Sequence, residues 1–283
     1  MIAARQVAAR LGITGPALLN IVNNLVPGDA GAIRRASGIA YGPDARQRLD
    51  VWAPRRASGA SPVLVFFYGG GWVAGRREDY AFAARAYAAL GFVVVLPDYR
   101  LVPHVVFPAF VEDGAAAIRC TIDTIARFGG DPQCLLLAGH SAGAYKAVLL
   151  ALDRSYLVAA GVDPGVIRGA AGLAGPYDFH PFSGRAVAAM AGVADPMITQ
   201  PISFVRSDAP PLWLGHGTAD AIVRPHNSIA LAAHVVEVGG RATLRLYEDL
   251  NHEALVKALS KPFRSKAPVL AESAAFLHSA ASA

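Results

Sequence analysis

The sequence predicts an α/β fold in which a mainly parallel sheet is covered by helices on both faces. Continuous apolar runs of β type alternate along the chain with segments of helical periodicity, which is the pattern of parallel strands joined by helices. The 283 residues can bury a large core, and 54% hydrophobic against 17% charged residues excludes disorder as the overall state. A polytopic membrane protein is also excluded, because no stretch of about 18 uninterrupted apolar residues occurs.

Apolar periodicity places the elements in order. The expected strands are Leu49–Trp52, Val63–Tyr68, Phe92–Leu96, Cys134–Ala138, Val166–Leu173, Pro211–Leu214 and Thr243–Tyr247. The expected helices are Asp79–Leu90, Phe110–Phe128, Ala142–Leu152, His226–Val238 and Pro268–Ser279. Turn residues separate these elements: a Gly-Gly-Gly sequence follows Tyr68, Pro97 ends the third strand, and Asp131-Pro132 precedes the fourth.

Residues 1–26 are expected to form a separate N-terminal helical segment, with Leu18, Leu19, Val22 and Leu25 on one face. Glycine, proline and asparagine interrupt its apolar stretch, so it is a poor signal peptide. No repeat or long linker divides residues 27–283, which are expected to form a single domain. The expected location is cytoplasmic, or exported or periplasmic if the native N-terminus carries a signal.

The net charge of +5 does not indicate a nucleic-acid partner, because the basic residues are spread over the chain. Their small groups include Arg34-Arg35, Arg55-Arg56 and Arg76-Arg77. Only two cysteines occur, Cys120 and Cys134, and neither a CxxC motif nor a Cys/His cluster is present. We expect neither a disulfide framework nor a metal site.

A candidate nucleophile lies at one strand–helix junction. Residues 139–143 read Gly-His-Ser-Ala-Gly, a G-x-S-x-G motif between the strand Cys134–Ala138 and the helix Ala142–Leu152. A sharp strand–turn–helix needs small residues on both sides of the serine, and it lifts the serine hydroxyl above the sheet. The bare motif is common by chance, but this context predicts Ser141 as a catalytic nucleophile.

A serine hydroxyl needs a base and an orienting carboxylate. Two segments that follow strands supply them in the chain order of such sites, Asp220 in Gly-Thr-Ala-Asp and His252 in Asn-His-Glu. His140 is expected to point away from the reaction centre and His216 to be a packed, hydrogen-bonded histidine. The other candidates for the acid are Asp249, Glu248 and Asp195, whereas Glu253 is expected to point elsewhere.

The Tyr-Gly-Gly-Gly-Trp sequence that ends the second expected strand predicts an oxyanion hole. Glycines let the main chain approach a substrate and turn its amides inward. We expect the amides of Gly70, Gly71 and Ala142 to be the donors. A phosphate cradle is the competing interpretation, but no Lys-Ser/Thr follows the glycines and G-x-G-x-x-G is absent.

These motifs resemble those of the α/β-hydrolase superfamily, and within it the small carboxylesterases close to the hormone-sensitive-lipase-like group. The resemblance extends from about Arg48 to Leu277. Its motifs are LDVWAP at 49–54, YGGGW at 68–72, PDYRLVP at 97–103, GHSAG at 139–143, AGPYDF at 174–179, GHGTAD at 215–220 and NHE at 251–253. Two positions depart from the pattern: Tyr68 stands where the group usually has histidine, and His104 where it has an acidic residue.

The resemblance implies an α/β-hydrolase fold with a triad of Ser141, Asp220 and His252, and hydrolysis of short-chain carboxylic esters without a cofactor. The segment between Gly175 and Pro210 leaves room for only a minimal cap. Arylformamidase and acetyl-xylan-type deacetylase activities share nearly the same motifs and remain alternatives. A non-catalytic binding protein on a hydrolase scaffold is an alternative of another class. The expected partner is a small-molecule ester, with no nucleic acid and no integral membrane segment, and a homodimer is left open.

Overall fold

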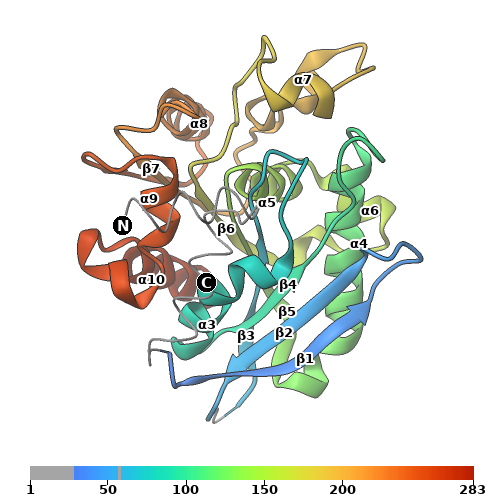
Figure 1. Ribbon diagram of the computed structural model, residues 1–283, viewed down its shortest axis with the longest axis vertical. Helices are drawn as coiled ribbons and strands as arrows, with labels where there is room; N and C mark the ends of the chain where they lie inside the picture. Colours follow the sequence, from blue (N-terminus) through green and yellow to red (C-terminus); the bar gives the residue numbers. More distant parts are fainter. Residues whose placement is uncertain (1–28, 57–58) are drawn as a thin grey trace, which may run out of the picture.

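The computed structural model describes residues 29–56 and 59–283. These residues form an eight-stranded sheet in the order β1-β2-β4-β3-β5-β6-β7-β8 (Figure 1). The strands are β1 (Ala32–Ala40), β2 (Arg48–Pro54), β3 (Ser61–Phe67), β4 (Val93–Pro97), β5 (Gly130–His140), β6 (Ile167–Leu173), β7 (Leu212–Gly217) and β8 (Ala242–Tyr247). Strands β4, β3 and β5 to β8 are parallel, whereas β2 is antiparallel to both β1 and β4. The expected mainly parallel sheet is confirmed.

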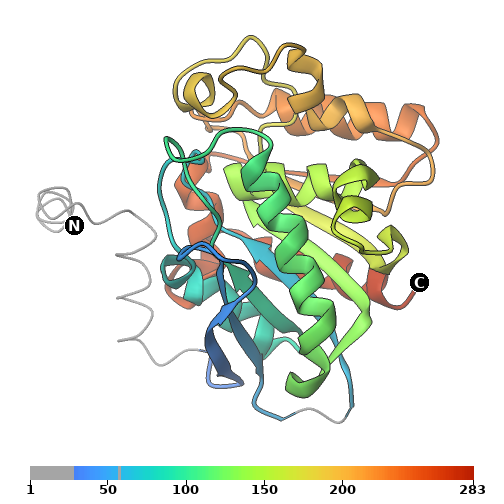
Figure 2. The same ribbon diagram turned by 90° about the vertical axis from the view of Figure 1, so that its right-hand side faces the viewer.

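Helices cover both faces of this sheet. They are α3 (Ala81–Ala89), α4 (Ala109–Thr124), α5 (Ala142–Leu152), α6 (Arg154–Ala159), α7 (Arg185–Ala189), α8 (His226–Glu237), α9 (His252–Lys257) and α10 (Val269–Ala281). Helices α3 and α10 share one face, where the Tyr87 hydroxyl lies 2.7 Å from Ser273 Oγ. Helices α4, α5 and α6 cover the other face (Figure 2). None of the described helices combines the length and the apolar character needed to span a bilayer.

The centre of the sheet explains the continuous apolar runs of the sequence. Val63 to Phe67 of β3 and Leu135 to Ala138 of β5 have no exposed surface. A strand that is covered on both faces needs apolar residues at successive positions, because its side chains point alternately to the two faces. The helices on the two faces therefore hold β3 and β5 in the middle of the core, and the carboxyl ends of these strands form part of the site described below.

Strand β1 is an element that the hydrophobic pattern did not predict. Its sequence AIRRASGIA is largely exposed or half-buried, and its pairing with β2 is irregular at two places. An edge strand with one solvated face carries few apolar residues, so its periodicity is weak. Three short helices, α6, α7 and α9, were not expected either, because five or six residues are too few to show a helical period. The expected elements keep their type, with boundaries moved by a few residues; the expected helix Phe110–Phe128, for example, is α4 followed by a 3₁₀ turn, Ile125–Phe128.

The segment between β6 and β7 forms a small layer above the carboxyl ends of the strands, with α7 as its one α-helix (Figure 1). Two 3₁₀ turns, Pro196–Thr199 and Pro201–Phe204, complete it. This is the minimal cap that the sequence leads us to expect. The expected helix over residues 1–26 lies outside the described residues, so that helix and the domain boundary beside it remain predictions.

Candidate active site

Ser141 lies at the turn between β5 and α5. Its backbone has φ 57° and ψ −124°, a conformation that is strained for a residue with a side chain. The Ser141 amide donates a 2.9 Å hydrogen bond to the carbonyl oxygen of Leu173, the last residue of β6. The turn is therefore held by the neighbouring strand, and it has the strained geometry of a nucleophile elbow.

The two glycines of the G-x-S-x-G motif are required by backbone contacts. A Cβ atom on Gly143 would lie 2.1 Å from the carbonyl oxygen of Phe67 in β3. A Cβ atom on Gly139 would lie 2.4 Å from the backbone of Gly143. Because the obstructing atoms are main chain, no side-chain movement could relieve the overlap. The motif thus lets α5 start directly against the strands.

The candidate acid and base come from two loops that are joined to each other. Asp220 follows β7, and His252 is the first residue of α9, just after the loop that follows β8. The amides of Thr218 and Ala219 donate to the carbonyl oxygens of Tyr247 and Leu250, at 2.9 and 3.1 Å. These two bonds hold the loops side by side, so residues 32 positions apart in the sequence meet.

Asp220 and His252 form a hydrogen-bonded pair. His252 Nδ1 donates to Asp220 Oδ2 over 2.7 Å, while Asp220 Oδ1 accepts the amides of Ile222 and Val223, each at 2.9 Å. The backbone bonds fix the carboxylate, and the carboxylate fixes the imidazole with its proton on Nδ1. Nε2 is then left without a proton and can act as a base.

His216 also helps to stabilise the ionised form of Asp220. Its ring is fully buried, with Nδ1 2.7 Å from Ser228 Oγ and Nε2 donating to the Val223 carbonyl over 2.8 Å. Nε2 also lies 3.4 Å from Asp220 Oδ2. Burial raises the pKa of Asp220, but the hydrogen bonds from His216 and His252 outweigh it and hold the pKa below its usual range. The acid is therefore ionised at neutral pH, and His216 is packed as expected.

His140 is placed differently from the expectation. Instead of pointing away from the reaction centre, its ring lies 4.7 Å from that of His252, measured between ring centroids. Its Nε2 donates to the His252 carbonyl over 3.1 Å, and its Nδ1 accepts from the Tyr80 hydroxyl over 2.9 Å. Burial, followed by the nearby His252, holds the pKa of His140 well below its ordinary value. His140 is thus a neutral residue that supports the backbone of the candidate base, a role for which its place beside Ser141 was the only signal in the sequence.

Ser141 is brought to the same end of the sheet as this pair but is not bonded to it. Within the described residues, no hydrogen bond joins Ser141 Oγ to His252, although His140, the residue before Ser141, contacts both the ring and the backbone of His252. In unliganded hydrolases such bonds are often long and shorten when substrate binds. Of the two hydrogen bonds of the expected triad, the structure shows the one between Asp220 and His252, and Ser141 lies beside this pair through its neighbour His140.

The other acidic candidates are engaged elsewhere or exposed. Asp195 accepts the amide of Met197 as a helix cap, and Glu253 Oε2 lies 2.6 Å from Lys257 Nζ. Glu248 and Asp249 are exposed on the loop after β8. Asp220 is the carboxylate that contacts His252.

The candidate oxyanion donors come from two elements. Gly70 and Gly71 follow β3 with φ of 143° and 62°, angles that glycine adopts without strain. Ala142 is the first residue of α5, where the amide has no partner within the helix. Since β3 and β5 are adjacent and parallel, the loop and the helix terminus lie side by side at the carboxyl ends of the strands. Arg185 of α7 donates to the Gly70 carbonyl over 3.3 Å and connects the cap to this loop.

An aromatic cluster lies next to the oxyanion loop. Trp72 stacks on Phe179 of the cap segment, with ring centroids 6.1 Å apart, and meets Tyr145 of α5 edge-on at 5.3 Å. Phe182 of the cap joins this cluster through Phe179, and Met190 of the cap is buried at 2% exposure.

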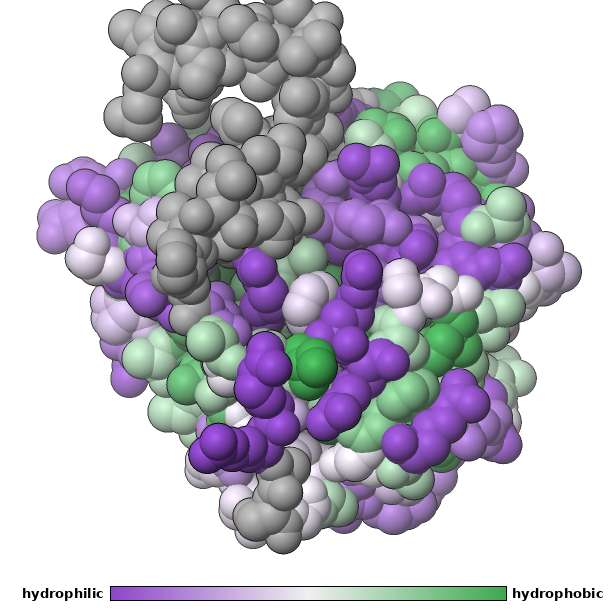
Figure 3. Space-filling view, turned by 60° about the horizontal axis from the view of Figure 1, so that its bottom comes forward, coloured by the Kyte–Doolittle hydropathy of each residue, from purple (hydrophilic) through white to green (hydrophobic). Residues whose placement is uncertain are grey.

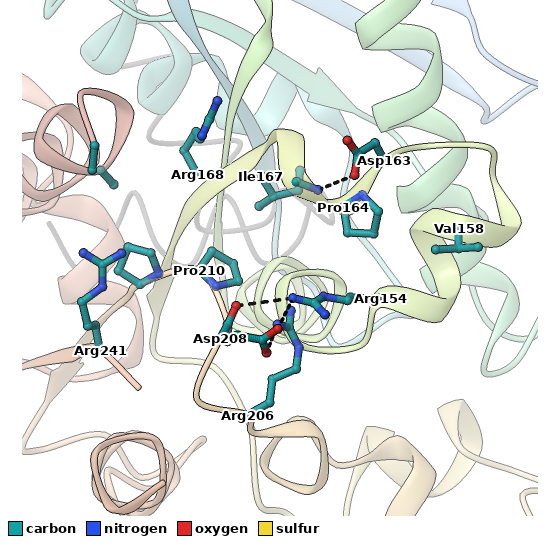
Figure 4. A pocket seen from close by; sticks show the side chains of 15 residues that line it. Arg154, Val158, Asp163, Pro164, Ile167, Arg168, Arg206, Asp208, Pro210 and Arg241 are labelled. Atoms are coloured by element: carbon teal, nitrogen blue, oxygen red, sulfur yellow. Dashed lines mark hydrogen bonds and ion pairs between the residues drawn. The ribbon is translucent and has the colours of Figure 1, made fainter. Parts of the chain in front are cut away.

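A cavity of about 630 Å³ lies away from this site (Figure 4). It is lined by residues just before or at the start of β6, β7 and β8, such as Arg168, Pro211 and Arg241, and so lies at the amino ends of the parallel strands. Asp208 pairs there with Arg154 and Arg206 at 2.6 and 2.7 Å. The described residues contain no cluster of three or more histidine, cysteine or acidic side chains that could hold a metal ion.

The mainly parallel sheet, the strained serine turn and the Asp220–His252 pair are the features of an α/β-hydrolase fold with a candidate serine-hydrolase site. Residues 49–235, more than half of the chain, match the model of the BD-FAE family. The chain belongs to this family.

Curated relatives include esterases from a bacterium and from a plant. Esterase LipQ of Mycobacterium tuberculosis is 33% identical over 229 residues, which cover 72% of this chain and 53% of LipQ. A probable isoprenylcysteine alpha-carbonyl methylesterase, ICMEL1 of Oryza sativa subsp. japonica, is 28% identical over 249 residues, covering 80% of this chain and 58% of the relative. The chain thus spans little more than half the length of these relatives.

Solved structures agree on the fold. Esterase B from Lactobacillus Rhamnosis superposes with a TM-score of 0.80 over 99% of this chain and 93% of its own, at 20% sequence identity. At that identity the likeness shows the α/β-hydrolase fold alone.

Proposed function

We propose that the protein is a serine carboxylesterase that cleaves short-chain carboxylic esters through an acyl-enzyme on Ser141. The observation that carries the proposal is the 2.7 Å hydrogen bond from His252 Nδ1 to Asp220 at the end of the sheet where Ser141 lies on its strained turn. A base that is oriented by a carboxylate beside an elevated serine is the arrangement that acyl transfer requires.

The reaction follows from this geometry. His252 Nε2 takes the proton of Ser141 as Oγ attacks the ester carbonyl, and Asp220 stabilises the imidazolium that forms. The amides of Gly70, Gly71 and Ala142 stabilise the tetrahedral oxyanion. His252 then protonates the leaving alcohol, and water attacks the acyl-enzyme by the same steps. These residues supply the whole sequence of steps without a cofactor.

The relatives support this activity by name, since LipQ and LipC are called esterases, NlhH is called a carboxylesterase and others are called isoprenylcysteine alpha-carbonyl methylesterases. Because this chain covers only part of each of them, their activity is carried to it as a proposal. The small cap supports short acyl chains. It consists of α7 and two 3₁₀ turns, and Phe179 brings it against Trp72 of the oxyanion loop.

Hydrolysis of p-nitrophenyl acetate, butyrate and octanoate tests the proposal. We expect turnover by the wild type to fall from the short to the long chain. Ser141→Ala should lower kcat by about 10⁴-fold or more, because it removes the nucleophile. Ser203→Ala is the matched control: Ser203 is an exposed cap residue, and its loss should leave kcat unchanged.

The other outcomes are informative. Activity retained by Ser141→Ala would refute the nucleophile. A wild type that ignores all three esters but hydrolyses N-formylkynurenine would replace the proposal by an arylformamidase, and inactivity on both substrates would favour a binding role.

A further inference from the structure

Lys146 is a buried side chain that the proposed mechanism does not use. It lies on α5, five residues after Ser141, and has no exposed surface. Among the described residues its Nζ has no hydrogen-bond partner and lies over the ring of Tyr99, with the Phe67 ring centroid at 5.1 Å. An amino group without a partner is costly to bury, and an apolar side chain of the same length would fill this space at lower cost.

The ring that Lys146 covers, that of Tyr99, is the first of two stacked tyrosine rings that lead to the oxyanion loop. Tyr99 stacks on Tyr68, with ring centroids 4.5 Å apart and an angle of 18° between the rings. The Tyr99 hydroxyl donates to the Tyr68 carbonyl over 3.0 Å. That carbonyl belongs to the peptide that enters Gly69, so Tyr99 holds the main chain at the point where the oxyanion loop begins.

Arg46 closes the column from the other side. Its Nη2 donates to the Tyr68 hydroxyl and to the Gly75 carbonyl, both at 2.8 Å, and its Nε donates to the Tyr99 carbonyl over 2.9 Å. Tyr68 and Gly75 flank the oxyanion loop, residues 69–74. One guanidinium thus holds both ends of the loop together.

Acidic residues near Lys146 do not explain its burial. Asp98 and Asp113 are the charges that favour its protonated form. Asp113 is already paired with Arg100 at 2.7 Å, and Asp98 is paired with Arg77. Neither carboxylate needs a further cation, and neither is bonded to Nζ.

We propose that Lys146, Tyr99, Tyr68 and Arg46, which we call the Tyr68 column, position the oxyanion loop relative to α5. The inference rests on the proposed function, because the oxyanion donors come from that loop, at Gly70 and Gly71, and from α5, at Ala142. Donors must lie within about 2.7–3.1 Å of the developing oxyanion, so a small shift between the two elements weakens the hole. Lys146 lies on the helix that carries one donor, and the column joins it to the loop that carries the others.

Two substitutions separate positioning from a merely structural role. Lys146→Met removes the buried amino group but keeps the length of the side chain. If Lys146 only fills space, the Lys146→Met protein should be more stable to urea than the wild type and have an unchanged kcat. We expect instead that it is at least as stable as the wild type but loses about tenfold in kcat, with KM changed less than twofold. Tyr99→Phe keeps the stack and removes the bond to the Tyr68 carbonyl, and we expect a similar fall in kcat.

Tyr87→Phe is the matched control. Tyr87 is also a fully buried tyrosine with one hydroxyl hydrogen bond, but it bonds to Ser273 on the far face of the sheet. The Tyr87→Phe protein should lose about as much stability as the Tyr99→Phe protein, but its kcat should equal that of the wild type. Hydrogen exchange gives a readout that needs no turnover: the amides of residues 69–72 should exchange faster in Tyr99→Phe than in Tyr87→Phe.

The outcomes distinguish the inference from the proposed function. Ester turnover by the wild type with unchanged kcat in Lys146→Met and Tyr99→Phe would overturn the column and leave the esterase intact. No turnover by the wild type would overturn the esterase. In that case faster exchange at residues 69–72 in Tyr99→Phe would still support the column, and equal exchange in Tyr99→Phe and Tyr87→Phe would refute it.

Discussion

The two carboxylate oxygens of Asp220 have different roles. One oxygen is bound by backbone amides, which anchors the carboxylate, and the other accepts from His252. The anchoring explains why a short, buried side chain can orient a ring that comes from another loop. It also keeps the carboxylate ionised, because each of these bonds favours the charged form.

Asp220→Asn tests this division at the residue scale. The amide cannot accept and stabilise the Nδ1 proton as a carboxylate does, so His252 is expected to adopt the wrong tautomer. We expect kcat for p-nitrophenyl butyrate to fall by about 10⁴-fold, the size found when a triad acid becomes its amide.

The control for this substitution is Asp163→Asn. Asp163 likewise accepts a backbone amide, that of Gly165 at 2.9 Å, but it lies at the amino end of β6. The kcat of the Asp163→Asn protein should match that of the wild type. Equal activity of Asp220→Asn and Asp163→Asn would show that Asp220 is not the acid.

The strand–turn–helix unit of β5 and α5 is the element on which the site depends. Its strained serine is held because β3 and β6 fix it from both sides: Phe67 of β3 lies against Gly143, and Leu173 of β6 accepts the Ser141 amide. The strain is thus supported by packing around the turn rather than by the turn itself.

Gly143→Ala should damage this unit. The new Cβ atom would lie 2.1 Å from the Phe67 carbonyl oxygen, so α5 and β3 must separate. We expect a loss of about 1–3 kcal/mol in the free energy of unfolding, measured with urea, as for other overpacked sites. We also expect a lower kcat, since Ser141 and Ala142 would move with the helix.

Gly59→Ala is the comparison for the change from glycine to alanine. A Cβ atom at Gly59 meets no atom within 4 Å, and the backbone there is not in the left-handed region. Its stability and kcat should both stay close to those of the wild type. A Gly143→Ala protein as stable and active as Gly59→Ala would contradict the close packing of α5 on β3.

At the scale of the whole molecule, hydrophilic side chains dominate one face of the surface, whereas the core contains a few buried titratable side chains. The face seen in Figure 3 carries mostly hydrophilic residues, with apolar residues in small separate groups. Inside the molecule, burial lowers the pKa of His140 and of Lys146 below their ordinary values. Stability should therefore depend on pH.

The sign follows from proton binding. In the unfolded chain His140 takes up a proton near pH 6.5, whereas in the folded chain it stays neutral to a lower pH. Below pH 6.5 the unfolded state thus binds more protons, so the free energy of unfolding falls as the pH falls, by at most about 1.4 kcal/mol per pH unit from this group. His140→Gln keeps a donor for the His252 carbonyl and cannot titrate, so its dependence should be shallower.

Urea unfolding between pH 5 and 8 measures this dependence. His104→Gln removes an exposed histidine and should reproduce the wild-type slope. Slopes that coincide for wild type, His104→Gln and His140→Gln would refute the assignment.

The sequence by itself determined the α/β class and the alternation of the longer strands and helices, and it predicted Ser141, Asp220 and His252 as the candidate triad. These features have local signals: apolar periodicity, a glycine-flanked serine and turn residues after strands. The carboxyl ends of parallel strands share one edge of the sheet, so residues just after such strands could be expected to meet.

Only the tertiary structure decided the contacts between distant segments. The bond from His140 to the carbonyl of His252 joins residues 112 positions apart, and the Tyr68 column joins Arg46, Tyr68, Tyr99 and Lys146 from four different segments. Strand β1 belongs here too, because it is stabilised by pairing with β2 rather than by its own pattern. Such contacts leave no periodicity in the sequence, since each partner is chosen by the packing of the sheet and its helices.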